Sequence, residues 1–125
     1  MQNAKCKNDI YERTFEFACR IVRLHRAVRG ITARPLLNQM LRSGTGIGAN
    51  LEEAEAGQSK PDFISKTRIA LKEARETVYW LRLIAATEIV KPASRIDPLI
   101  QESREITAIL TTIVRNASEN PSRKR

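Results

Sequence analysis

Apolar residues recur at intervals of three and four along most of the chain, in four stretches separated by short polar breaks. This spacing places the apolar side chains of each stretch on one face of a helix. The pattern predicts helices over residues 8–29, 35–57, 60–88 and 97–117. Four helices with short connections predict an all-α protein, an antiparallel up-down-up-down four-helix bundle.

Residues that begin and end helices stand at the expected boundaries. Asn8 or Asp9 can cap the first helix, Pro35 and Pro61 suit first turns, and Gly30 suits the position after a helix end. We expect the bundle to occupy residues 9–118. A flexible basic segment over residues 1–8 and a disordered basic tail over residues 119–125 are expected to flank it.

The second helix contains three glycines, Gly44, Gly46 and Gly48. Each costs a helix about 1 kcal/mol relative to alanine. Gly44 and Gly48 lie on the core side, where close approach of another helix offsets the cost; a kink or break at GTGIG is the alternative. A phosphate-binding loop is disfavoured, because no strand precedes the glycines and no lysine follows in the required place.

The third helix carries a second stripe besides its core face: Ile69, Glu73, Glu76, Trp80 and Leu83. A surface helix needs only one apolar face, so this stripe predicts a contact outside the bundle, an oligomer interface. Arg42, Asn50 and Glu53 lie on or beside a similar stripe of the second helix. We expect these three to be structural and to join the helix-three carboxylates, with Arg42 meeting Glu73 or Glu76 within or between subunits. The alternative is a solvated face.

The 125 residues suit one domain, and no apolar run approaches the roughly 18 residues of a membrane span. The N-terminus lacks the apolar core of a signal peptide, so a cytoplasmic protein is expected. His25 is the single histidine, and it lies at the edge of the core stripe. Because a di-metal site needs several histidines and a catalytic triad needs one beside its partners, both are disfavoured. We therefore expect no metal, no cofactor, no small-molecule substrate and no enzymatic activity. Glu73 and Glu76 as an acid–base pair are the alternative.

The net charge of +8 is confined to the two ends of the chain. Residues 1–34 carry +5, residues 115–125 carry +3, and the ten basic and ten acidic residues between them cancel. Because the ends of such a bundle share a pole, the charges are expected to form one basic surface that contacts nucleic-acid phosphates. The candidate residues are Arg13, Arg20, Arg23, Arg26, Arg29, Arg34, Arg123, Lys124 and Arg125.

Two phrases resemble a known family. The run R-S-x-x-x-I-x-A-N-x-x-E and the phrase IALKEARETVYWLRLI resemble the four-helix-bundle proteins encoded by intervening sequences of bacterial 23S rRNA genes. The run consists of Arg42, Ser43, Ile47, Ala49, Asn50 and Glu53. The resemblance covers about residues 10–114, and it departs at Gly48, where many relatives have proline.

The family is similar to accessory variability proteins of diversity-generating retroelements, which form pentameric barrels that bind nucleic acid and a reverse transcriptase. The resemblance therefore implies a homopentamer and a nucleic-acid role, and it supplies no catalytic residues. We expect a non-enzymatic, oligomeric protein that binds RNA or DNA backbone. The alternative is a protein-interaction scaffold whose ring docks an acidic or reverse-transcriptase-like partner.

Overall fold

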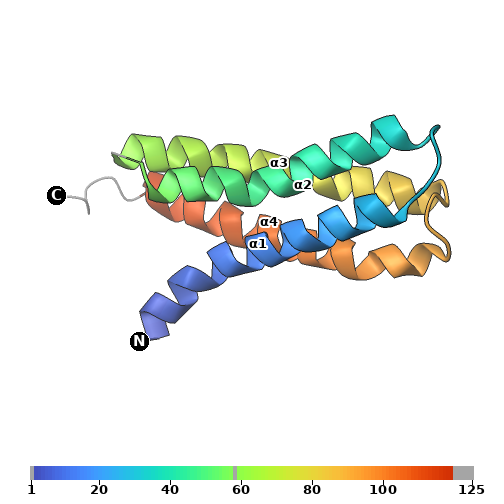
Figure 1. Ribbon diagram of the computed structural model, residues 1–125. Helices are drawn as coiled ribbons and strands as arrows, with labels where there is room; N and C mark the ends of the chain where they lie inside the picture. Colours follow the sequence, from blue (N-terminus) through green and yellow to red (C-terminus); the bar gives the residue numbers. More distant parts are fainter. Residues whose placement is uncertain (1, 58, 120–125) are drawn as a thin grey trace.

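The computed structural model describes residues 2–57 and 59–119, with side chains from Ile10 onward. Four helices of alternating direction pack side by side (Figure 1). They are α1 (Gln2–Ala27), α2 (Arg34–Glu55), α3 (Lys60–Ala86) and α4 (Asp97–Glu119), and the short 3₁₀ turn η1 (Ala93–Ile96) precedes α4. No strand occurs among the described residues. The predicted antiparallel four-helix bundle is confirmed.

The helix boundaries differ from the expected ones mainly in α1. This helix begins at Gln2, ahead of the expected caps at Asn8 and Asp9, and it runs through the segment expected to be flexible. The sequence there, QNAKCKN, contains Gln, Ala and Lys, which favour helix, so the cap signal did not mark the start. The expected tail falls partly outside the described residues, and α4 continues to Glu119.

The predicted start of α3 is confirmed in detail. Ser59 caps the helix, since its hydroxyl accepts a hydrogen bond from the backbone N–H of Asp62 at 3.2 Å. The helix ends at Ala86, because Glu88 adopts a left-handed conformation with φ of 59°.

Small hydroxyl side chains lie inside the apolar core. The buried polar residues are Thr14, Ser43, Thr67, Thr77 and Ser103. The hydroxyls of Thr77 and Ser43 are 2.8 Å apart between α3 and α2, and Ser103 of α4 donates to the backbone oxygen of Ala74 at 3.2 Å. These bonds satisfy polar groups that would otherwise be costly to bury, and they link three helices.

The glycines of α2 mark close approach of its neighbours, and the helix continues through them without a break. A Cβ at Gly44 would lie 2.9 Å from Cγ1 of Ile21, and one at Gly48 would lie 3.4 Å from Oγ1 of Thr14, both on α1. The predicted close approach is thus confirmed, with α1 as the neighbour.

Gly44→Ala is expected to destabilise the bundle by about 1 kcal/mol, because overpacking costs about 1–3 kcal/mol and improved helix propensity returns about 1 kcal/mol. The neighbour, Ile21, is fully buried and β-branched, and it cannot move aside cheaply. Urea unfolding measures the change. Gly46→Ala is the matched control, since its Cβ would meet only the Glu73 side chain at 3.4 Å. Equal midpoints for the two variants would contradict the close-packing explanation.

Candidate functional site

Five arginines and no acidic residue occur between residues 20 and 34, where α1 ends and the connection to α2 begins. This connection and the one between α3 and α4 lie at the same pole of the bundle (Figure 1). Arg23, Arg26 and Arg29 are exposed. Arg26 and Arg29 have no ion-pair partner in the described part of the chain. We call this end of the molecule the arginine pole, defined by Arg20, Arg23, Arg26, Arg29, Lys91 and Arg95.

The arginine pole contains two shallow depressions. One of about 590 Å³ is lined by Arg23, Arg26, Ala27 and Arg29. The other, of about 570 Å³, shares Arg26 and Arg29 with it and includes Ile31, which is 85% exposed. Guanidinium groups arranged around open hollows are suited to anionic oxygens, to which they donate in bidentate pairs.

Lys91 and Arg95 were missed by the sequence argument. They lie in the α3–α4 connection and in η1, within a region whose net charge is zero, so the charge count gave no signal. The expected topology could have placed these two residues near the arginines, because helices of alternating direction bring the first and third connections to one pole (Figure 1).

The expected joining of the two basic chain ends does not extend to the arginines near the C-terminal end of α1. At a rise of about 1.5 Å per residue, the 26 residues of α1 extend about 39 Å, so the arginines at its C-terminal end lie far from its start. Arg115 belongs to the last turns of α4, at the opposite pole from the α1–α2 connection (Figure 1). Arg123, Lys124 and Arg125 lie outside the described residues.

Arg13 and Arg34 have structural partners. Arg13 donates to Glu102 at 2.8 and 3.0 Å and to Glu105 at 2.9 Å, which links α1 to α4. The bond to Glu102 raises the pKa of Arg13; the pKa of Glu105 is lowered, first by Gln101 and then by Arg13. Arg34 donates to the Val28 backbone oxygen at 2.6 Å. Both guanidinium groups, which the sequence placed among the phosphate-binding candidates, are therefore engaged within the protomer.

His25 is partly buried, as expected at the edge of the core stripe. Its Nε2 atom lies 2.8 Å from Asn38 Oδ1 and 3.3 Å from Arg34 Nη1. These contacts fix the start of α2 against the end of α1. No group of three metal-ligating side chains occurs among the described residues.

The Arg42 pairing is confirmed and lies within one chain. Arg42 of α2 donates to Glu73 at 3.2 Å and also pairs with Glu76, both on α3. Glu76 additionally accepts a hydrogen bond from Trp80 Nε1 at 3.1 Å. The Glu73 side chain is only 14% exposed, so Arg42 neutralises a carboxylate largely removed from water.

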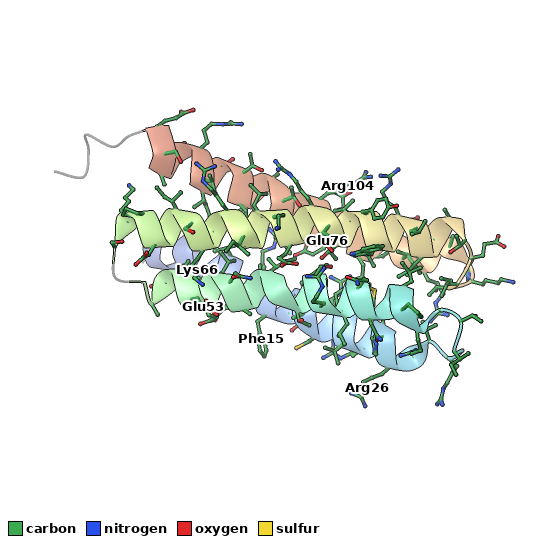
Figure 2. The ribbon with its side chains drawn as sticks, turned by 90° about the horizontal axis from the view of Figure 1, so that it is seen from above. Phe15, Arg26, Glu53, Lys66, Glu76 and Arg104 are labelled. Carbon is green, nitrogen blue, oxygen red and sulfur yellow. The ribbon has the colours of Figure 1, made fainter. Side chains whose placement is uncertain are left out.

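Asn50 and Glu53 do not join this network. The Asn50 amide donates to the Gly46 backbone oxygen of its own helix at 2.8 Å, and Glu53 pairs with Lys66 at 2.7 Å between α2 and α3 (Figure 2). Glu53 and Lys66 are more exposed than Glu73, so their ion pair contributes little to stability.

Some residues of the second stripe of α3 contact the rest of the protomer, and others are exposed. Glu73 and Glu76 form ion pairs with Arg42, and Trp80 packs partly against the core. Ile69 is 37% exposed, and Leu83 is partly exposed. The stripe therefore has fewer residues for an external contact than expected, because α2 covers its polar members.

Together the fold and the surface define a small all-α bundle with a concentrated basic pole and internal ion pairs between helices. No described helix is both long enough and apolar enough to cross a membrane. The chain belongs to the family of 23S rRNA-intervening sequence proteins, whose family model matches residues 6–112.

A solved structure supports the same assignment. The chain is 42% identical to a protein of unknown function from the S23 ribosomal protein family of Bacteroides thetaiotaomicron VPI-5482, whose crystal structure it matches with a TM-score of 0.79. The match covers 86% of this chain and 96% of the other. A comparison with curated proteins gives no match.

Proposed function

We propose that the protein binds the sugar-phosphate backbone of nucleic acids through the arginine pole. The observation that supports the proposal is the composition of residues 20–34, five arginines without an acid within this stretch of sequence, at one end of the bundle. Such a concentration raises the local density of anions and steers polyanions to the surface. Arginine contacts to phosphate fix position and do not read bases, so we expect little sequence preference.

Structured RNA and duplex DNA fit the pole better than a single strand. Single-strand binding proteins stack bases on aromatic side chains. Among the residues with described side chains, the exposed aromatic residues are Phe15 and Tyr79, and neither lies in the α1–α2 connection. Backbone contact without stacking is the mode that remains.

Filter binding with generic duplex DNA and structured RNA across a salt series tests the proposal. We expect binding at low salt and a steep fall towards moderate salt, because each neutralised phosphate releases counterions. Absence of binding to both probes at low salt would overturn the proposal.

The second candidate function is a protein scaffold whose basic pole docks an acidic partner. Ile31, exposed among arginines in one of the depressions, favours this candidate, because an apolar residue contributes more to a protein interface than to a phosphate contact. The same salt series separates the two, since a scaffold would not bind generic nucleic acid.

Assembly is the second part of the proposal. The exposed Ile69 and the partly exposed Leu83 of α3 are the apolar residues available for a subunit contact, and the family resemblance suggests five subunits. Light scattering is expected to give five times the 14.2 kDa of one chain. Ile69→Glu is expected to reduce the mass without unfolding the protomer, because the side chain lies outside the core. A monomer in the unchanged protein would contradict assembly.

A substitution at Arg13 tests which arginines contribute to nucleic-acid binding and which to stability. Arg13→Gln is expected to leave nucleic-acid affinity within about twofold, because its guanidinium is held by Glu102 and Glu105, and to lower the melting temperature. Filter binding and thermal unfolding measure the two effects. A large loss of affinity with unchanged stability would place Arg13 in the binding surface instead.

A further inference from the structure

The outer face of α1 has a regular composition that the core does not explain. Its residues are Glu12, Phe15, Glu16, Cys19, Val22, Arg23 and Arg26. Phe15 is 68% exposed, and Glu16 and Arg23 are each 65% exposed. Phe15 and Arg26 project from the same side of the bundle (Figure 2). Residues seven apart differ by only about 20° around a helix, so the face consists of three short rows.

Charge changes sign along this face. Glu12 and Glu16 stand in its first half, Arg23 and Arg26 in its second half, and the apolar Phe15, Cys19 and Val22 lie between. A helix face of this kind is complementary to itself when two copies pack in opposite directions. Glu12 then meets Arg26 of the second copy, Glu16 meets Arg23, Phe15 meets Val22, and Cys19 meets Cys19.

All these pairs share one symmetry axis. The midpoint of each pair falls within half a residue of position 19: it is 19 for residues 12 and 26, 19.5 for 16 and 23, and 18.5 for 15 and 22. A single two-fold axis through Cys19 therefore satisfies every pair at once, which is the requirement for an isologous contact. Within the chain, Arg23 lies 3.8 Å from Glu16, and both side chains are exposed, so this weak pair leaves both free to exchange partners.

We propose that a second copy of this chain docks on the outer face of α1, helix against helix and antiparallel, about a two-fold axis at Cys19. One helix pair buries less than the roughly 1,200 Å² of stable interfaces, so the contact is weak and sensitive to salt. Arg23 and Arg26 also belong to the arginine pole, and a protomer uses them for either the second copy or nucleic acid at a given time. The dyad stands independently of the proposed function.

Disulfide cross-linking reports the axis directly. In a Cys6→Ser background at low salt and without nucleic acid, copper phenanthroline is expected to join Cys19 to Cys19, with two electrons and two protons passing to the oxidant. The matched control replaces Cys19 by serine and introduces Ala27→Cys, an exposed position on the same helix. Eight residues from the axis, two such cysteines stand about 24 Å apart and are not expected to join. Equal yields for the two proteins, or no product from Cys19, would overturn the proposal.

Charge exchange tests the pairing itself. Glu12→Arg with Glu16→Arg makes the face wholly basic, and Arg23→Glu with Arg26→Glu makes it wholly acidic. Each variant alone is expected to lose most of the Cys19 cross-link, and a mixture of a tagged and an untagged variant is expected to regain it as the mixed dimer. Circular dichroism verifies that each variant is folded; the single variants Glu16→Arg and Arg23→Glu, each alone and mixed in the same way, serve if a double variant is not. Cross-linking of each variant with itself, as in the unchanged chain, would overturn the proposal.

Discussion

Reversing the charges of Arg26 and Arg29 together is expected to lower the affinity for generic duplex DNA at low salt by about a hundredfold. Both side chains are exposed, both line the two depressions of the arginine pole, and neither has an ion-pair partner among the described residues. The double variant Arg26→Glu with Arg29→Glu removes two phosphate contacts and places two carboxylates against the backbone. Thermal unfolding is expected to change little, because neither side chain supports the core.

The matched control is Arg75→Glu with Arg104→Glu. Arg75 lies on α3 and Arg104 on α4, both are exposed, and the change in net charge is the same. Arg104 and Arg26 lie on opposite sides of the bundle (Figure 2). We expect this control to lose only a few-fold in affinity. Equal losses for the two double variants would show that net charge, and not the arginine pole, governs binding.

Removing Arg42 is expected to have the largest effect on stability of any exposed residue. Arg42→Ala leaves Glu73 and Glu76 beside one another without a cation, and the Glu73 side chain is 14% exposed. We expect a loss of about 2 kcal/mol, less than for a fully buried pair because Arg42 itself is half exposed. Urea unfolding gives the change in free energy.

A second substitution separates charge from packing. Arg42→Ala combined with Glu73→Gln and Glu76→Gln is expected to recover much of the loss, because no unpaired charge remains between α2 and α3. Arg75→Ala, on a solvated face of α3, is the control and is expected to change stability by less than about 0.5 kcal/mol. An unchanged midpoint for Arg42→Ala would show that its face is merely solvated.

Some patterns within one helix were read correctly from the sequence, although the cap signal at Asn8 and Asp9 did not mark the start of α1. The stripe of α3 and the neighbouring stripe of α2 placed Arg42 opposite Glu73 and Glu76, and the structure joins them. The close approach at Gly44 was also predictable, because a costly glycine on a core face requires a compensating neighbour. Both inferences depend on helical periodicity, which a sequence displays directly.

Partners from distant segments were not predictable in the same way. The pairing of Arg13 with Glu102 spans 89 positions of the sequence, and nothing near Arg13 distinguishes it from the free arginines of the same helix. The arginines near the end of α1 were wrongly assigned to a common surface with the C-terminus because residues 1–34 were treated as one end of the bundle, although α1 alone spans its length. The ion pair of Glu53 with Lys66 could likewise not be predicted, because it depends on the register between α2 and α3.

The salt dependence of binding to one duplex tests the central claim most directly. The slope of log affinity against log salt concentration counts the phosphates that the protein neutralises, with about 0.9 for each contact. We expect Arg26→Gln with Arg29→Gln to reduce the magnitude of this slope by about 2 and Arg75→Gln with Arg104→Gln to leave it unchanged. Identical slopes for the unchanged protein and the first variant would contradict phosphate binding at the arginine pole.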